Sequence, residues 1–222
     1  ELFQMCGLPN MNVEVPCDYI ETHRAAEYLL FKVKGPKYIR FAREATPVVT
    51  DDNTPYVWGK ANVIRFRGEK PSFKDAFEHR LASGYKNEKE DVAIVACGPS
   101  VVEAMRAVWI LKREYGIETR VLNLHTVKPI DTEALTAAAG DCGVVVTAEE
   151  HQVGGMGNRV AAVIQSSEKL YGKPVVMGMI GVQDRFGDSG APWELLKEFG
   201  LSAEHIAAKA KQLYDLKAKR KK

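Results

Sequence analysis

Between residues 91 and 222, short apolar segments alternate regularly with amphipathic segments of helix length. Short, nearly continuous apolar segments are typical of strands that are buried on both faces of a parallel sheet. Ser100 and Glu103 have capping-box spacing at the start of one amphipathic segment, which supports a helix there. This alternation predicts an α/β fold, a three-layer α/β/α sandwich with a mostly parallel sheet. The predicted strands are 91–97, 118–124, 143–148 and 174–180, and the predicted helices are 100–115, 131–139, 157–171, 192–200 and 203–217.

Residues 1–50 contain a smaller piece of α/β structure. Asp18 and Glu21 have the spacing of a capping box, which predicts that a helix starts here. Strands are expected on either side of this helix, at 12–16 and at 37–43. Large apolar residues alternate with charged ones in the second of these segments, as they do in half-buried strands.

Residues 51–90 interrupt this pattern with many charged residues, glycines and prolines. We expect a linker or insertion here, with one or two short elements. A hairpin is predicted around 60–65 and a helical turn around 73–82. The sequence therefore divides into residues 1–50, a linker or insertion at 51–90, and an α/β domain at 91–222.

The charge of the chain is nearly balanced, with 31 lysines and arginines against 29 aspartates and glutamates. This balance favours neither nucleic acid nor an anionic membrane as a partner. No apolar run approaches the roughly 20 residues that a membrane-spanning helix needs. We therefore expect partners other than nucleic acids and membranes.

Four cysteines, at positions 6, 17, 97 and 142, form no C-x-x-C pair and match no zinc-binding spacing. Free thiols in a reducing compartment explain them best, which predicts a cytoplasmic location. The chain starts at Glu1 and not at a methionine. We therefore expect a trimmed or processed piece of a longer protein.

Glu149, Glu150 and His151 directly follow the predicted strand at 143–148. Open α/β sheets bind ligands at the carboxyl edge, where these three residues are expected. Two carboxylates and an imidazole can carry out acid–base chemistry. Neighbouring residues of an extended chain point to opposite faces, so the two carboxylates cannot easily act on one proton. A structural or interface role is the favoured interpretation.

Gly154, Gly155 and Gly157 precede a predicted helix. The N-terminus of a helix can hold an anion. The spacing is not that of the Gly-x-Gly-x-x-Gly dinucleotide motif, and no ribose-binding acid follows about 20 residues later. Close packing of the helix on the strand is the better explanation of these glycines, which again indicates a structural role.

Arg40 and Arg43 lie in the predicted strand at 37–43. Three positions apart on a strand, they are expected to face opposite sides, with at least one of them near a cleft. A guanidinium group is planar and forked, so it can bind a phosphate through two hydrogen bonds. Without further information, a surface ion pair is the favoured role.

Residues 184–190 read Asp-Arg-Phe-Gly-Asp-Ser-Gly and are too rich in glycine for a helix or strand. We expect a tight loop in which Phe186 points inward while Asp184, Arg185 and Asp188 pair locally. By itself the loop predicts no chemistry. Its candidate structural or interface residues are Asp184, Phe186, Gly187, Ser189 and Gly190.

Nearly the whole chain resembles the C-terminal half of transketolase. Residues 8–18, with a Pro-Asn turn, a strand and Pro-x-Asp, resemble a late segment of that family's pyrimidine-binding domain. Residues 35–43 resemble the final strand of the same domain, and residues 91–222 resemble the complete C-terminal domain. The most specific match is 184–190, followed by Leu-Leu-Lys-Glu-Phe-Gly-Leu at 195–201. The resemblance thus implies a partial α/β pyrimidine domain in front of the three-layer domain.

Transketolases transfer a two-carbon ketol unit between phosphorylated sugars of the pentose phosphate pathway, using thiamine diphosphate and a divalent metal ion, magnesium or calcium. The resemblance implies this transferase activity for the intact enzyme. It matches Arg43 to the arginine that holds the substrate phosphate, with Arg40 as a second and less secure candidate for this role. The pyrophosphate-binding domain and the first part of the pyrimidine domain have no counterpart in this sequence.

The resemblance therefore predicts no catalytic residue in this chain, and no cofactor or metal bound by the chain alone. It implies an N-terminal transketolase half as partner, in the same chain or as a separate subunit, and a homodimer. Two alternatives stay open. One is a non-catalytic assembly or dimerisation module. The other is the C-terminal part of a deoxyxylulose-phosphate synthase or of a 2-oxo acid dehydrogenase beta subunit, although Phe-Gly-x-Ser-Gly favours transketolase.

Overall fold

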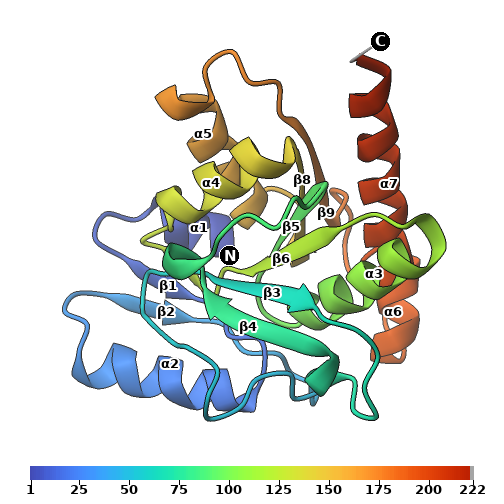
Figure 1. The fold of residues 1–222 in the computed structure, drawn as a ribbon. Coiled ribbons are helices and arrows are strands. Elements are labelled where there is room, and N and C mark those ends of the chain that lie inside the picture. The colour runs from blue at the N-terminus through green and yellow to red at the C-terminus, as the bar shows by residue number, and fades with distance from the viewer. Residues whose placement is uncertain (221–222) are drawn as a thin grey trace.

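The computed structural model describes residues 1–220. The larger of its two β-sheets has six strands (Figure 1). The strand order is β4-β3-β6-β5-β8-β9. β6, β5, β8 and β9 run parallel, whereas β3 is antiparallel to both β4 and β6. The strands are β3 (Asn62–Phe66), β4 (Phe77–Leu81), β5 (Val92–Ala96), β6 (Thr119–Asn123), β8 (Val144–Gln152) and β9 (Val176–Val182).

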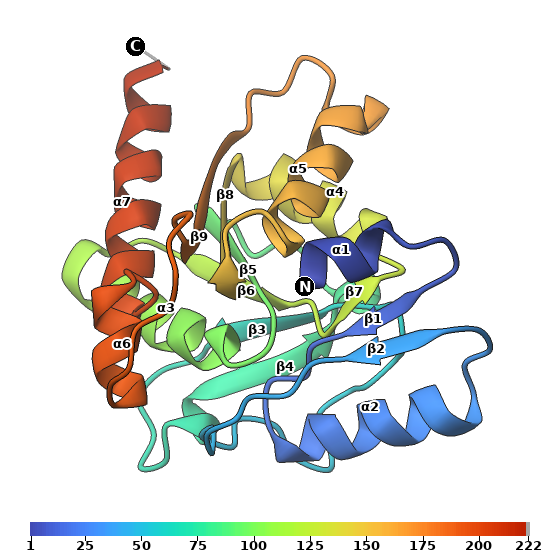
Figure 2. The same ribbon diagram turned by 180° about the vertical axis from the view of Figure 1, so that it is seen from behind.

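Helices cover both faces of this sheet, as the two opposite views show (Figures 1 and 2). Ile94 and Val146 point into one hydrophobic cluster, with α3 and α7, and their neighbours Val95 and Val145 point into another, with α4 and α5. The central strands are therefore buried on both faces, which confirms the three-layer α/β/α sandwich. The helices of these layers are α3 (Ser100–Tyr115), α4 (Thr132–Cys142), α5 (Met156–Ser166), α6 (Pro192–Glu198) and α7 (Ala203–Arg220).

A second, three-stranded sheet joins the N-terminal residues to the rest of the chain. β1 (Asn12–Glu14) lies between β2 (Lys37–Ile39), which is parallel to it, and β7 (Thr126–Lys128), which is antiparallel. α1 (Leu2–Gly7) and α2 (Tyr19–Phe31) flank β1 in the sequence. β7 follows β6 of the larger sheet after only two residues, and β7 pairs with β1. The N-terminal strands are therefore held against the rest of the chain through β7. The division at residues 50 and 90 stays a prediction.

The helical turn predicted around 73–82 is confirmed only at its start, where a 3₁₀ turn spans Lys74–Ala76, and strand β4 follows it at Phe77–Leu81. β4 pairs with β3 along its whole length, and β3 pairs with β6, so residues of the predicted linker extend the main sheet. The rings of Phe66 and Phe77 pack at this pairing with their centroids 5.4 Å apart. Pairing with β3 and packing against Phe66 favour a strand at 77–81 over the helical preference of the local sequence, because strand formation depends strongly on neighbouring strands.

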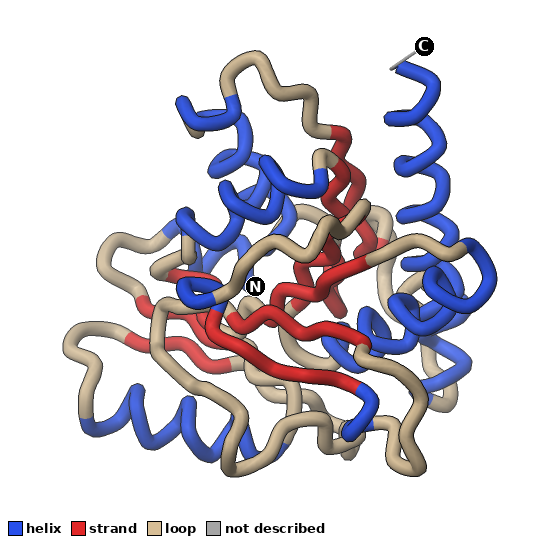
Figure 3. The backbone as a smooth tube through the Cα atoms, viewed as in Figure 1, coloured by secondary structure: helices blue, strands red, loops and turns tan. Residues whose placement is uncertain are grey.

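The loop between β2 and β3 is long, and both of its ends are anchored (Figure 3). At the first end, the backbone N–H of Arg40 donates to the carbonyl of Glu14 over 2.9 Å. Near its middle, Asp18 accepts hydrogen bonds from the backbone N–H groups of Val49 (2.9 Å) and Thr50 (2.7 Å), and at the second end the N–H of Ala61 donates to Asp131 over 3.0 Å. Asp18 also caps α2, as its spacing predicts. The segment that carries Arg43 is thus held in place from both sides.

None of the helices within residues 1–220 combines the length and the apolar character that crossing a membrane requires.

Stability is expected to fall when the pH drops from 7 to 4, because both ring nitrogens of the half-buried His79 in β4 are buried and the imidazole is neutral. Neither ring nitrogen has a hydrogen-bond partner among the described residues, and burial lowers the pKa of His79 to about 4. The unfolded chain binds this proton at the higher, ordinary histidine pKa. The stabilising contribution of neutral His79 to the free energy of unfolding is therefore complete above pH 6.5, where the imidazole of the unfolded chain is also neutral. This contribution is lost as the pH falls towards 4. The loss amounts to about 3 kcal/mol at most.

Urea unfolding at both pH values measures this effect. A His79→Leu variant should lose less stability between pH 7 and 4 than the unsubstituted chain. His23 on α2 is exposed, so His23→Leu is the matched control and should keep the full pH dependence. An unchanged pH dependence in His79→Leu would contradict the assignment.

Candidate functional site

β8 continues past the predicted end of its strand and carries three candidate residues. Its backbone stays extended through residue 152, so Glu149, Glu150 and His151 alternate in direction. The side chain of Glu149 is fully buried against the start of α5. Glu150 instead lines a hollow that it shares with Arg43. The two neighbouring carboxylates therefore have different surroundings and cannot act on one proton.

Glu149 is the anion that the glycine-rich turn binds. Its carboxylate accepts hydrogen bonds from the backbone N–H groups of Gly154 (3.0 Å), Met156 (2.5 Å) and Gly157 (3.1 Å). Nε2 of His151 lies 2.9 Å from the same carboxylate. These N–H groups include those at the start of α5, where the helix dipole favours a negative charge. The protein's own carboxylate thus fills the place where an anionic ligand would bind.

Replacing Gly157 by alanine is expected to lower the free energy of unfolding by about 1–3 kcal/mol, because the new methyl group has no room. A Cβ atom there would lie 2.9 Å from both Met179 Sδ and Thr147 Oγ1, and 3.2 Å from Glu149 Oε1. Denaturant unfolding measures the change. Gly187→Ala is the control, since no heavy atom lies within 4 Å of its Cβ position. Equal losses in the two variants would show that crowding at Gly157 is not the cause.

The predicted strand that carries Arg40 and Arg43 ends earlier than expected. β2 stops at Ile39, because its partner β1 ends at Glu14 and offers no further strand to pair with. The expectation that the two arginines face opposite sides of one strand is therefore wrong. Arg40 donates a guanidinium hydrogen bond to the carbonyl of Glu150 over 2.8 Å. Arg43 lies in an exposed bend beyond it.

Phe186 does not point inward as predicted, since its side chain is 98% exposed. The loop at 184–190 leaves β9, which is an edge strand of the sheet, so no neighbouring strand provides a wall against which the ring could pack. The loop is tied to β8 by its backbone. Gln152 Nε2 donates a hydrogen bond to the carbonyl of Arg185 over 2.7 Å.

Arg185 is the side chain that anchors this loop. Its guanidinium lies 4.2 Å from the ring centroid of Phe199 and pairs with Glu198 at 2.8 Å. Asp188 lies 3.7 Å from the same guanidinium, so these two residues pair locally as expected. Asp184 forms no ion pair within the part of the chain that the structure describes. The loop is therefore held at Arg185, and residues 187–190 lie beyond the anchor.

The bend with Arg43, the end of β8 and the loop at 187–190 meet at one hollow of about 480 Å³. The sequence predicts Arg43, Glu150, Gly187, Ser189 and Gly190 as separate candidates, and the structure brings them together. Glu149, His151 and the glycines at 154, 155 and 157 are not among its lining residues. The lining that sequence reasoning missed is Glu44, Asp188 and the apolar group Val182, Pro192, Leu195, Leu196, Phe199 and Leu201.

Glu150 is the half-buried carboxylate of this hollow, which we call the Arg43 hollow. Burial raises the pKa of Glu150, and the positive charges of Arg40 and His151 oppose this rise only in part. Glu44 and Asp188 are exposed, so water screens their charges. The Arg43 hollow therefore presents a guanidinium and a poorly solvated carboxyl to the same space.

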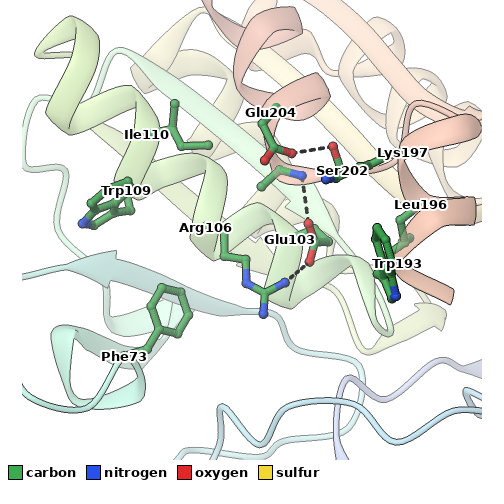
Figure 4. A pocket seen from close by; sticks show the side chains of 11 residues that line it. Phe73, Glu103, Arg106, Trp109, Ile110, Trp193, Leu196, Lys197, Ser202 and Glu204 are labelled. Carbon is green, nitrogen blue, oxygen red and sulfur yellow. Dashed lines mark hydrogen bonds and ion pairs between the residues drawn. The ribbon is translucent and has the colours of Figure 1, made fainter. Parts of the chain in front are cut away.

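A second hollow, of about 470 Å³, lies between α3, α6 and α7 (Figure 4). Its charged groups are largely engaged with one another, because Glu103 pairs with Arg106 and Ser202 Oγ donates to Glu204 over 2.6 Å. It therefore offers apolar surface more than acid–base chemistry. The apolar side chains that line it are Phe73, Trp109, Ile110, Trp193 and Leu196.

The capping box predicted for Ser100 and Glu103 is absent. α3 begins at Ser100 itself, with Pro99 at the N-cap position and no side-chain cap. Glu103 instead accepts a hydrogen bond from the backbone N–H of Ala203, over 2.8 Å, at the start of α7. The Ser-x-x-Glu spacing therefore predicts a cap on α3, whereas Glu103 caps α7. The start of α7 lies next to Glu103 only because the two helices pack together in the folded chain.

Sequence comparison finds one family. A family model described as "Transketolase, C-terminal domain" matches residues 83–206. One subunit of an apulose-4-phosphate transketolase from Phocaeicola vulgatus is 33% identical over 204 residues, which are 91% of this chain and 56% of that protein. A 1-deoxy-D-xylulose-5-phosphate synthase from Thermomicrobium roseum is 33% identical over 205 residues, which are 91% of this chain and 28% of that protein.

Structure comparison agrees with the sequence. A split-gene transketolase, solved as an inactive beta4 tetramer, matches with a TM-score of 0.76 and 32% identity over 97% of this chain and 61% of that chain. This chain therefore spans little more than half the length of the split-transketolase relatives that it matches. Since the family model covers more than half of the chain, including the four parallel strands of the larger sheet, this protein belongs to the transketolase family through its C-terminal domain.

Proposed function

We propose that this chain is the C-terminal part of a transketolase, as a region of a longer chain or as one subunit of a split enzyme. The intact enzyme transfers a two-carbon ketol unit between phosphorylated sugars, as in the pentose phosphate pathway. The observation that carries this proposal is the Arg43 hollow, in which Arg43 meets the loop segment 187–190. That segment belongs to the part of the sequence most specific for transketolases.

In this proposal Arg43 binds the phosphate group of the substrate. Its guanidinium forms no ion pair or side-chain hydrogen bond with residues 1–219, so its donors are available. A phosphate oxygen pair matches the forked donors of a guanidinium, which fixes the orientation of the sugar as well as its charge. Arg40, by contrast, is engaged with the backbone of Glu150. Arg40 therefore has a positioning role in this proposal.

The N-terminal half holds the thiamine diphosphate and the divalent metal ion, magnesium or calcium, of the intact enzyme. The glycine-rich turn of this chain does not fit a diphosphate, because Glu149 already occupies its N–H groups. Residues 1–220 also contain no group of three or more His, Cys, Asp and Glu side chains placed to hold a metal ion. We therefore propose that this chain contributes substrate binding to the intact enzyme.

Two surfaces support an N-terminal half as the partner. β2 pairs only with β1 within the described chain, so its other edge is free. On α2, the large apolar side chains of Tyr19, Leu30 and Phe31 are 67%, 70% and 76% exposed. Free strand edges and exposed apolar side chains are typical of surfaces that another chain covers. We propose that the N-terminal half covers them, that two such pairs form the dimer, and that the enzyme is cytoplasmic, as its free thiols suggest.

Replacing Arg43 by alanine is expected to raise the KM for phosphorylated sugars about 10- to 100-fold, since hydrogen bonds to a charged group are lost. The assay uses the enzyme reconstituted from this chain and its N-terminal half, with xylulose 5-phosphate and ribose 5-phosphate. The KM for unphosphorylated sugars should stay the same. Arg80, an exposed arginine on β4 that pairs with Glu78, provides the control variant Arg80→Ala. Equal KM changes with both kinds of sugar would refute a phosphate-binding role.

Calorimetry with thiamine diphosphate and magnesium comes before that assay. Binding only after this chain is mixed with the N-terminal half supports the proposal. A folded chain that shows neither binding nor ketol transfer in the mixture supports a non-catalytic assembly module instead. The likeness to a deoxyxylulose-phosphate synthase keeps a second candidate. Formation of deoxyxylulose 5-phosphate from pyruvate and glyceraldehyde 3-phosphate, without ketol transfer, would favour it.

A further inference from the structure

Glu150 is a charged group of the Arg43 hollow to which the proposed function gives no task. Its side chain is half-buried, and its carboxylate has no hydrogen bond or ion pair within residues 1–219. Partial burial disfavours the charged form of a carboxylate. Burial raises the pKa of Glu150 for this reason. The group is therefore short of hydrogen-bond donors, which a ligand can supply.

Hydrogen bonds link the strand of Glu150 to the segment that carries Arg43. Glu150 lies in the extended end of β8, and Arg40 donates to its carbonyl over 2.8 Å. Arg40 is in turn bound through its backbone N–H to Glu14 of β1. Arg43 follows Arg40 by three residues. A short segment therefore lies between Arg43 and the hydrogen bond that joins Arg40 to Glu150 in β8. Hydrogen bonds thus join the end of β8 to the start of this segment, and Arg43 lies in the exposed bend beyond them.

The two opposite charges face the same hollow without pairing. No nitrogen of Arg43 lies within 4.0 Å of a carboxylate oxygen of Glu150, and the hollow between its walls measures about 480 Å³. An ion pair at this position would engage the donors of Arg43 with Glu150. The separation instead leaves room for a molecule that offers an anion at one point and a hydrogen-bond donor at another.

We propose that Glu150 accepts a hydrogen bond from the substrate hydroxyl on the carbon next to the phosphate-bearing carbon. This inference rests on the proposed function, because Arg43 must hold the phosphate for Glu150 to meet that hydroxyl. The substrate class is then a phosphorylated sugar with a free hydroxyl at this carbon. The intervening atoms keep the phosphate charge away from the carboxylate. Glu150 is thus a specificity-determining residue.

The test pairs a change in the protein with a change in the substrate. The reconstituted enzyme is assayed with D-erythrose 4-phosphate and with its 3-deoxy analogue, which lacks this hydroxyl. We expect Glu150→Ala to raise the KM for erythrose 4-phosphate about tenfold and to leave that for the 3-deoxy analogue unchanged. The kcat should change little. Glu150→Gln keeps an acceptor oxygen and should recover most of the lost affinity.

Equal KM changes for the two substrates would overturn the inference, since the effect would not depend on the hydroxyl. A lower KM for both would also overturn it, because Glu150 would then act by repelling the phosphate. Arg43→Ala distinguishes these outcomes from a failure of the proposed function. If Arg43→Ala leaves the KM of phosphorylated substrates unchanged, the phosphate site is wrong, whatever the result for Glu150.

Discussion

A Glu149→Ala variant is expected to have a free energy of unfolding about 4 kcal/mol below that of the unsubstituted chain. The substitution removes a fully buried carboxylate and leaves the backbone N–H groups of Gly154, Met156 and Gly157 without their acceptor. An unpaired buried donor costs about 1–3 kcal/mol, and there are three of them here. Loss of the negative charge at the start of α5 adds to the effect. Urea unfolding followed by circular dichroism measures it.

The neighbouring residue provides a matched control. Glu150 has the same side chain on the same strand, but its carboxylate accepts no hydrogen bond within residues 1–219. Glu150→Ala is therefore expected to change stability by about 1 kcal/mol at most. Comparable losses in the two variants would mean that general strand stability, and not the bound turn, explains the effect of Glu149→Ala.

A Glu90→Ala variant is expected to lose about 3 kcal/mol of unfolding free energy, because two buried arginines lose their shared buried acid and keep the more exposed Asp141 and Glu118 as close acidic partners. Glu90 Oε2 lies 2.6 Å from Arg120, and Oε1 lies 3.3 Å from Arg65. Arg65 and Arg120 are only 6% and 3% exposed. Burial alone would raise the pKa of Glu90, but the Tyr85 hydroxyl and both guanidinium groups lower it. Glu90 is therefore ionised in the native protein, and its removal leaves the positive charges of Arg65 and Arg120 less well compensated.

Glu88 distinguishes a buried pair from a surface pair. Its side chain is 36% exposed and pairs mainly with Arg67, which is 34% exposed, while the buried Arg65 lies 3.8 Å away. Exposed pairs contribute about 0–1 kcal/mol, so Glu88→Ala should be nearly neutral. If Glu90→Ala and Glu88→Ala proved equally mild in chemical denaturation, the buried pairs of Glu90 would not stabilise the sheet edge.

Much of the fold could be predicted from the sequence. The segments around Ile94 and Val146 are apolar at consecutive positions, which happens when both faces of a strand are covered by helices. Asp18 and Asp131 cap the helices that they precede, because a cap forms with N–H groups only three residues away. Such local contacts depend on few residues, so their pattern is visible in the sequence.

The errors share one physical cause, which is contact between distant segments. β4 is a strand because β3 pairs with it and is itself paired to β6. Glu103 caps α7 instead of α3, because α7 packs beside it. Phe186 is exposed because its loop leaves an edge strand. None of these partners can be identified from spacing alone.

The sequence by itself determined the order of strands and helices, the parallel sheet buried on both faces and the resemblance to one family. It also named Arg43, Glu150 and residues 187–190 as separate candidates. Only the tertiary structure decided that these residues share one hollow, while Glu149 closes the glycine-rich turn. The reason is sequence distance, since the hydrogen bond from Arg40 to Glu150 joins residues 110 positions apart. Periodicity records which face of an element is buried, but the partner that buries it is chosen by the packing of the whole chain.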